Sequence, residues 1–461
     1  MQLSAVSDSY DYSPVLLTPR WNLNIPLNLW LGIACCSAAM IIFYMTGYKT
    51  WMIIMPAMMF LLILFFRPAL GLFLTVIMYV PDQLFSAISG VDFTPGKYLP
   101  LLVLLACIRP FLASWNSSPV IRRILRMFLY LICWYFIALV LSPTMDSVSY
   151  CLQILLLYLF LFPATGLLGD LESLRKLCYA FVLVGSIGAI IVLSGYGVRY
   201  TGTGDRVLYG NLSINAISTN LGLCFIAGIA YWNISGKSLS KYLLIPLLVL
   251  LFIAILKTGT RSVIFGVPAA ILIPFMIYSG RKFLKYWIAA LIYIAAILFV
   301  FEFLSSNGMI TGTLYKRIVS GIGNNNKSDD IRMNLLKNGL EWYTENPLGC
   351  GPGSINEINI VYHGDREAHN TFVSTLLQTG LFGLLLLVSP LIYLFIAASR
   401  IRLQPFRISA IMINIYFVMQ LNKGSTLQTR IFWFQLLFCL LMIKVGAQES
   451  SSGSQNTYMV I

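Results

Sequence analysis

Four basic residues lie beside short polar breaks between apolar runs. Lys257 and Arg261 bound the sequence KTGTR, and Arg199 and Arg206 lie in the polar stretch around residues 197–210. A guanidinium group binds two phosphate oxygens at once through its fork of N–H donors. These positions therefore predict a site for a phosphate-bearing ligand. For Lys257 or Arg261 taken alone, snorkelling of the side chain to lipid headgroups is an equally good explanation.

The chain has two histidines, and both lie in the sequence VYHGDREAHNTF. A histidine in a loop is more often a solvated residue than a catalyst, and we interpret His363 in this way. His369 stands where the loop meets the next apolar run. Because imidazole titrates near neutral pH, His369 is the candidate general base.

Several catalytic signatures are absent from the sequence. It contains no P-loop, no H-E-x-x-H, no G-x-S-x-G and no D-x-D. No C-x-x-C occurs among the nine cysteines, so neither a zinc site nor a redox site is predicted, and we expect no metal and no cofactor. None of the 17 acidic residues lies at the centre of an apolar run, which disfavours a proton-coupled transporter.

The composition identifies the elements that position these residues. Hydrophobic residues make up 58% of the 461 residues and charged residues only 10%, whereas soluble domains are roughly a quarter charged. This excludes a soluble enzyme, a nucleic-acid binder and a disordered protein, and continuous apolar runs exclude a β-barrel. The fold class predicted is all-α, a polytopic membrane protein with about 14 transmembrane helices (12–14). The runs lie at 28–46, 51–66, 68–81, 98–113, 124–142, 149–167, 177–196, 211–232, 240–256, 261–279, 284–303, 370–397, 406–421 and 428–446.

Basic loops predict the topology. The net charge of +14 follows from the concentration of Lys and Arg in cytoplasmic loops, here 114–123, 168–176, 233–239, 280–283 and 398–405. The chain is thus expected to have a cytoplasmic tail at 1–27, eleven spans within 28–303, one large outer loop at 304–369, three spans within 370–446 and a cytoplasmic tail at 447–461. No cleaved signal peptide is expected. Arg199, Arg206, Lys257, Arg261 and His369 all fall on the outer side.

The sequence between about 200 and 385 resembles the O-antigen ligase and Wzy-type polymerase superfamily of bacteria. A Pro-x-x-Gly-x-Gly segment ends the long loop, a His-Asn pair opens the next helix, and that helix contains Gln-Thr-Gly-Leu-x-Gly. The upstream segments DRVLYGNLSINAIS and TGTRSVIFG resemble the family's two arginine segments. The residues that carry the signature are Asn346, Pro347, Gly349, Gly351, Gly353, His369, Asn370, Gln378, Thr379, Gly380, Leu381 and Gly383.

The resemblance implies a metal-independent, inverting glycosyltransferase of the GT-C type in the bacterial inner membrane, with its active site facing the periplasm or exterior. The donor is a glycan on undecaprenyl pyrophosphate. Carried over to this sequence, Arg206 and Arg261 hold the pyrophosphate and His369 activates the acceptor hydroxyl. The substrate-binding residues expected beside them are Arg199, Lys257, Arg332 and Asn370. A chain-length regulator and a flippase are the expected protein partners, and nucleic acid is not.

Polymerase and ligase differ in the acceptor, which is a lipid-linked repeat unit for a polymerase and the lipid A core for a ligase. Ten residues separate Arg199 from Gly210, the Arg-x10-Gly spacing of some polymerases. The corresponding pair in the long loop, Arg332 and Gly349, matches only approximately. These spacings and the extra spans favour a polymerase, with a ligase as the alternative. A flippase for a lipid-linked oligosaccharide is the alternative from another class, and it predicts related helical halves that the sequence does not show.

Overall fold

The computed structural model describes residues 67–77, 118–195, 198–200, 207–209, 212–236, 240–278, 327–353, 370–422, 427 and 429–451, with single positions between 288 and 306. The chain divides into two units, Met1–Met59 and Phe60–Ile461, and all described residues belong to the second. The predicted tail 1–27 and the predicted spans 28–46, 51–66 and 98–113 lie outside the described residues. Only scattered positions are described within span 284–303, and the loop that follows it is described at 306 and over 327–353.

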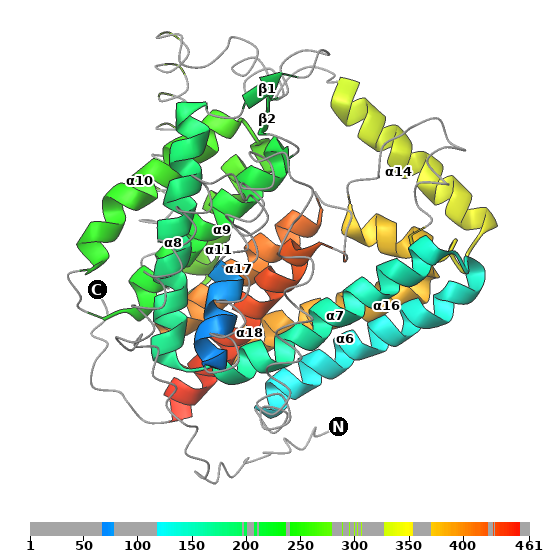
Figure 1. Ribbon diagram of the computed structural model, residues 1–461, viewed down its shortest axis with the longest axis horizontal. Helices are drawn as coiled ribbons and strands as arrows, with labels where there is room; N and C mark the ends of the chain where they lie inside the picture. Colours follow the sequence, from blue (N-terminus) through cyan, green and yellow to red (C-terminus); the bar gives the residue numbers. More distant parts are fainter. Residues whose placement is uncertain are drawn as a thin grey trace, which may run out of the picture. The chain divides into compact units, whose positions relative to one another are not determined.

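The described part of the chain is helical, which confirms the predicted fold class (Figure 1). Eight of its helices are long and apolar enough to cross a membrane, and a shorter apolar helix covers Pro68–Ile77. The main helices are α6 (Pro119–Ala138), α7 (Met145–Leu167), α8 (Leu171–Ser194), α9 (Ile214–Ile234), α10 (Ser240–Thr258), α11 (Arg261–Tyr278), α14 (Lys327–Glu345), α16 (Thr371–Ser399), α17 (Gln404–Leu421) and α18 (Arg430–Ser451).

Helices α6, α7 and α8 begin earlier than the apolar runs predict, because polar residues taken as loop form their first turns. Pro119 is the first residue of α6, a position where its missing N–H costs nothing. The Thr144 hydroxyl caps α7 by accepting from Ser147 N at 3.2 Å. Such caps satisfy N–H groups that a helix start leaves unpaired.

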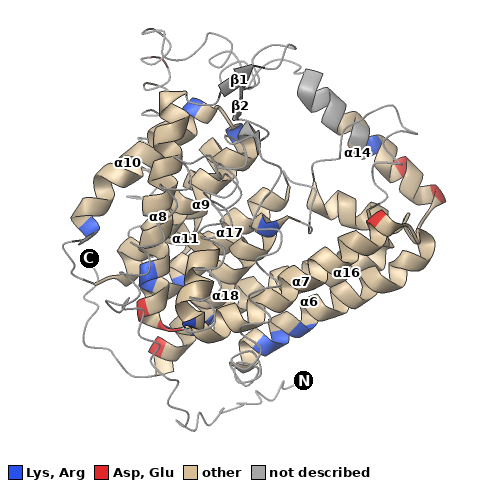
Figure 2. Ribbon diagram, viewed as in Figure 1, with Lys and Arg blue, Asp and Glu red and all other residues tan. Residues whose placement is uncertain are grey.

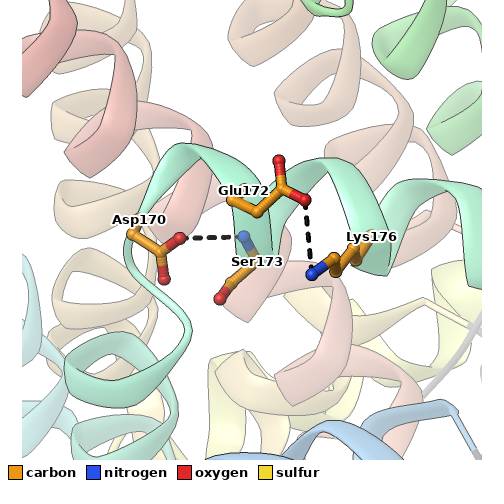
Figure 3. A network of polar contacts seen from close by, with 4 residues as sticks. All are labelled: Asp170, Glu172, Ser173 and Lys176. Atoms are coloured by element: carbon orange, nitrogen blue, oxygen red, sulfur yellow. Dashed lines mark hydrogen bonds and ion pairs between the residues drawn. The ribbon is translucent and has the colours of Figure 1, made fainter. Parts of the chain in front are cut away.

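The start of α8 is capped in the same way, here by a charged residue (Figure 3). The Asp170 carboxylate accepts from Ser173 N at 2.9 Å. One turn further, Glu172 and Lys176 form an ion pair at 3.3 Å. A carboxylate at the first turn also interacts favourably with the helix dipole. The charges that suggested a loop at 168–176 therefore stabilise a helix start.

The helices form two groups joined through α17 and α18. In one group α8, α9 and α10 pack on one another, and α17 packs on both α9 and α11. In the other, α6 packs on α7 and α16. Helix α18 contacts members of both groups, and its Phe432 and Trp433 rings meet Phe128 of α6 edge to face. Helix α18 is therefore the centre of the described bundle.

Helix α17 fills the predicted span 406–421 but is not among the eight most apolar helices. Its polar residues, including Ser409, Asn414 and Gln420, are buried against other helices. Burial in protein rather than lipid explains how a span can carry these amides and hydroxyls.

A small three-stranded antiparallel sheet precedes α9 and was not predicted. It consists of β1 (Val198–Tyr200), β2 (Val207–Tyr209) and β3 (Leu212–Ser213), in the order β1-β2-β3. Arg199 pairs with Leu208. Within the polar stretch between α8 and α9, the described strands β1 and β2 thus pair with each other, and β3 leads directly into the first turn of α9.

The helix termini gather at two ends of the bundle. We call "loop end" the end where α7, α9, α11, α16 and α18 begin and α6, α8, α10 and α17 finish, and "basic end" the opposite one. Arg175 of α8 donates to the carbonyl of Ile234 at the end of α9 from Nε at 3.1 Å and from Nη2 at 2.7 Å. Gln404, at the start of α17, donates to the Tyr278 carbonyl at the end of α11. These contacts belong to the basic end.

Charge distinguishes the two ends among the described helices (Figure 2). The basic end carries Arg122, Arg123, Arg126, Arg175, Lys176, Lys241, Arg400, Arg402, Arg407 and Lys444. The loop end carries Lys257, Arg261 and Arg430, and α14, which packs on α16, carries Lys337. This distribution agrees with the alternation of basic loops in the sequence.

Candidate active site

The structure describes three of the seven predicted site residues in full. They are Lys257, Arg261 and Asn370. Arg199 lies in β1 and Arg332 in α14, where the backbone is described. His369 and Arg206 lie outside the described residues, but each directly precedes a described one, Asn370 and Val207 respectively.

Arg261 is the first residue of α11 and is half-buried. A tight turn separates it from α10, with Gly259 at φ 62°. The carbonyl of Thr260 accepts from Val263 N and Ile264 N, both at 3.0 Å, so Thr260 occupies the capping position. The first N–H groups and the dipole of a helix favour an anion at this terminus. Arg261 therefore adds a guanidinium to a helix end that already attracts negative charge.

Lys257 has an intramolecular partner at the same end. Its ammonium donates to the Leu193 carbonyl at 2.7 Å, in the last turn of α8. A cation at a helix C-terminus pairs with carbonyls that the helix leaves unbonded. This contact ties the end of α10 to the end of α8, which is a structural role. Its predicted role in substrate binding stays a prediction.

Asn370 positions the start of α16. Its Oδ1 accepts from Phe372 N at 2.9 Å and Val373 N at 3.2 Å. Its Nδ2 donates to Asn422 Oδ1 at 3.5 Å, just past the end of α17. Asn370 is therefore held from both sides, where the start of α16 meets the end of α17.

Helix α16 is interrupted at Gly380, where the backbone turns to φ 70° and ψ −175°. The residues 371–379 and 381–399 therefore form two helical pieces with different directions (Figure 1). Three carbonyls lose their helical partners near such a break. A break of this kind in a membrane helix persists only where other groups satisfy those carbonyls.

Residues 346–353, which we call the docked segment, supply two of the missing donors. Cys350 N donates to the Leu377 carbonyl at 2.9 Å and Gly351 N to the Gln378 carbonyl at 3.0 Å. The third donor is the Trp134 indole of α6, which reaches the Thr379 carbonyl at 2.9 Å. All three carbonyls before the break are thus paired.

Glycine is required where the docked segment touches α16. An added Cβ at Gly349 would lie 2.6 Å from the Gln378 carbonyl carbon, and one at Gly380 would lie 2.7 Å from the Pro347 oxygen. Gly351 has φ 92°, and its Cβ would lie 2.6 Å from Ser142 Cβ. These approaches are closer than any side chain allows. The glycines of the signature are therefore structural and hold the first piece of α16 in place.

The last turn of α17 links the helix of Arg261 to the helix that follows His369. Gln420 Oε1 accepts from the Thr219 hydroxyl of α9 at 3.0 Å, and its Nε2 faces α11 beside Gly266. Two residues later, Asn422 meets Asn370 of α16. Arg261 and Asn370 therefore lie at the same end of the bundle, on elements that share α17 as a neighbour.

Sequence reasoning missed Trp134, Thr260 and Gln420. It singled out ionisable residues and the residues of the family signature, whereas each of these three is a neutral residue in or beside an apolar run. The signal available was the presence of a neutral hydrogen-bonding group in a run that is otherwise apolar, since such groups need a partner when they are buried.

The described residues contain no group of three or more His, Cys, Asp and Glu able to hold a metal ion. The large loop is only partly described, so the expectation that the reaction uses no metal stays a prediction.

Comparison with known proteins agrees with this arrangement. No curated protein matches the chain. A family model described as O-antigen ligase matches residues 246–388, which include the turn before Arg261, the docked segment, His369 and the break in α16. The match favours an enzyme and does not support a flippase. Over residues 246–388 the chain is thus similar to the O-antigen ligase family, a group of glycosyltransferase-like membrane enzymes.

Proposed function

We propose that the protein is a polysaccharide polymerase that transfers a glycan from undecaprenyl pyrophosphate to the hydroxyl of a lipid-linked repeat unit, on the outer face of the bacterial inner membrane. The observation that carries the proposal is the placement of Arg261 and Asn370 at one end of the bundle, joined through the last turn of α17. The candidate phosphate-binding cation and the residue next to the candidate base thus lie on two helices that both pack on α17, which supports the proposal.

In the proposed reaction His369 accepts the proton of the acceptor hydroxyl. The acceptor oxygen then forms a bond to the anomeric carbon of the donor, and the bond from that carbon to the diphosphate oxygen breaks. The electron pair leaves with undecaprenyl pyrophosphate, and attack from the opposite face inverts the anomeric configuration. A positioned base of this kind contributes about 10²–10⁴ in rate.

Arg206 and Arg261 act on the leaving group. Negative charge grows on the diphosphate as the bond breaks, so guanidinium contacts stabilise the transition state more than the ground state. Each charged hydrogen bond is worth about 1.5–3 kcal/mol. No metal is needed if two arginines and the start of α11 supply this charge. These features support a metal-independent GT-C-type reaction.

The β-hairpin before α9 supports a polymerase over a ligase. Arg199 lies in β1 and Gly210 directly follows β2, so the Arg-x10-Gly spacing corresponds to one folded hairpin at the loop end. The alternative is a ligase that transfers the chain to lipid A core, and the matching family model does not distinguish the two.

The test uses a strain that lacks its own copy of the gene. We expect His369→Ala and Arg261→Ala to abolish long-chain polysaccharide while the protein accumulates in the membrane. The matched controls are His363→Ala and Arg122→Ala, the latter removing an exposed arginine at the basic end. Long chains from either test variant would refute the catalytic assignment.

The glycan pattern of the deletion strain itself distinguishes a polymerase from a ligase. A lost polymerase leaves single repeat units on the core, whereas a lost ligase leaves long chains on the lipid carrier. The second pattern would establish the ligase alternative.

A further inference from the structure

Three exposed arginines lie in the first turns of α6, at the basic end. They are Arg122, Arg123 and Arg126, and Figure 2 shows basic positions next to one another along the start of this helix. Among the described residues none of the three forms an ion pair. The sequence contains no Asp or Glu between residues 93 and 145. The positive charge of α6 is therefore not neutralised by acidic residues near it in the sequence.

The position of these arginines is unfavourable for the helix itself. The start of a helix carries partial positive charge, which disfavours cations there, and like charges one turn apart repel each other. The neighbouring helix α16 shows the opposite case. Its C-terminal cap is Arg400, at a helix end where the dipole favours a cation. The dipole gives no such support at the start of α6, which favours an anionic ligand at that place.

Helix α16 fixes the direction of one of these arginines. Arg123 Nη1 donates to the Tyr393 hydroxyl at 3.3 Å, and the guanidinium carbon lies 5.6 Å from the centroid of the Tyr393 ring. A guanidinium has five N–H donors, so one bond to Tyr393 leaves others available. Arg126 lies one turn further along, where side chains on a helix surface are neighbours. Arg123 and Arg126 are therefore placed to contact the same ligand.

The face of α6 that carries Arg126 continues as an exposed apolar surface toward the loop end. Tyr130 and Ile137 follow Arg126 at helical spacing and are 54% and 58% exposed. Helix α6 is also one of the helices long and apolar enough to cross a membrane. Arginine, then tyrosine, then an aliphatic side chain matches the order of headgroup, interface and acyl chains in a bilayer. This order fits a phospholipid, whereas an acidic protein segment would leave the apolar part of the face unused.

We propose that Arg123 and Arg126 bind the headgroup phosphate of an anionic phospholipid, of the phosphatidylglycerol class, in the leaflet at the basic end. The fork of a guanidinium matches phosphate oxygens, and basic clusters next to a transmembrane helix attract anionic headgroups. Arg122, which is nearer to the start of the helix, adds to the positive charge. The inference concerns the basic end and does not depend on the proposed function.

The test measures binding of dioctanoyl phosphatidylglycerol to the full chain in detergent micelles by native mass spectrometry. Arg123→Gln/Arg126→Gln is expected to raise Kd about tenfold or more. Arg123→Lys/Arg126→Lys keeps the charge and is expected to raise Kd less. The matched control is Lys176→Gln/Lys241→Gln, which removes the same charge from α8 and α10 at the same end of the bundle. This control is expected to bind as the wild type does, because Lys176 already pairs with Glu172 and neither lysine belongs to the α6 surface.

The results that would overturn the inference are distinct. A wild-type Kd in Arg123→Gln/Arg126→Gln would show that the two arginines do not bind the lipid. Equal weakening in the lysine control would attribute binding to net charge rather than to α6. Dioctanoyl phosphatidylcholine has the same phosphate without net charge and is expected to bind the wild type about tenfold more weakly, so equal affinity would overturn the choice of an anionic lipid. If the double variant does not fold, Arg123→Gln and Arg126→Gln replace it singly, each with an expected rise in Kd of about fivefold.

Polyglutamate tests the alternative occupant, an acidic protein segment. It is added to the full chain in phosphatidylcholine nanodiscs, and the wild type and Arg123→Gln/Arg126→Gln are expected to bind it equally weakly. Polyglutamate binding that is lost in the double variant, together with unchanged binding of phosphatidylglycerol, would assign the surface to a protein partner and overturn the assignment to lipid.

Discussion

Trp134 provides a test of how the break in α16 serves catalysis. The Trp134 indole donates to the Thr379 carbonyl at 2.9 Å, one residue before the break at Gly380. Its ring also meets the Phe382 ring edge to face, with centroids 4.7 Å apart. Trp134→Phe removes the donor and keeps an aromatic ring against Phe382. The carbonyl of Thr379, a residue that is 1% exposed, is then left without its partner.

The expected cost follows from that single unpaired group. A buried acceptor left unsatisfied costs about 1–3 kcal/mol. The first piece of α16 keeps two of its three external donors, Cys350 N and Gly351 N, so the fold is expected to persist at a lower melting temperature. The first piece of α16 is nevertheless held less firmly at Thr379, the end opposite to the Asn370 cap. Since a misplacement of about 1 Å at a reacting group costs up to about 100-fold in rate, turnover should fall more than binding.

The assay compares kcat with the Kd for geranylgeranyl diphosphate in purified protein, together with thermal unfolding. Trp134→Phe is expected to lower kcat at least severalfold with Kd for the diphosphate unchanged, because Arg261, the candidate phosphate ligand, lies on α11 and not on α16. Trp232→Phe, at the basic end of α9, is the matched control and should keep wild-type kcat. If Trp134→Phe shows wild-type kcat and wild-type melting temperature, the third carbonyl needs no partner and the reasoning is wrong.

Two further predictions concern backbone conformation and helix capping. Gly380→Ala is expected to destabilise the protein by more than Gly195→Ala: both residues have φ near 70°, but only at Gly380 would a Cβ meet backbone, 2.7 Å from the Pro347 oxygen. The left-handed backbone of Gly195, with ψ 10°, costs a side chain about 1–2 kcal/mol. Gly380, with ψ −175°, lies in a region that essentially only glycine adopts, so equal melting temperatures would contradict both the backbone strain and the close contact. Asp170→Ala is expected to lower stability by about 1 kcal/mol through loss of the bond to Ser173 N, while Asp170→Asn retains the cap. Equal melting temperatures for the two Asp170 variants would show that the cap contributes nothing.

The sequence predicts the fold class and most of the described spans because apolar length alone determines what crosses a membrane. The nine spans predicted within 124–279 and 370–446 all correspond to helices in the structure. Their starts are predicted less well. Charged residues such as Asp170 and Glu172 indicate a loop when they are counted as polar, yet they form the cap and first turn of α8. Hydropathy alone does not distinguish a polar loop from a capped helix start, whereas the capping preference of Asp does.

The candidate site, too, could be predicted from the sequence only in part. The cations and His369 could be singled out because they carry charge or titrate in unusual places. The break in α16 could not be predicted, because Gly380 has no special meaning until Pro347 is known to approach it. Gln420 likewise could not be singled out, because its hydrogen-bond partner Thr219 lies 201 residues away along the chain. Contacts of this range depend on tertiary packing, and no local pattern contains them.

The signature residues that appear as one motif in the sequence serve two physical purposes. Gly349, Gly351 and Gly380 permit the close approach that pairs the carbonyls before the break in α16. Asn370 then caps the first piece of α16, which these contacts hold. His369 directly precedes Asn370 in the sequence. Substitution of a glycine should therefore destroy the fold of this region and substitution of His369 only the chemistry. In the proposed reaction the glycines matter as well, because the docked segment holds the piece of α16 that begins two residues after His369 in the sequence.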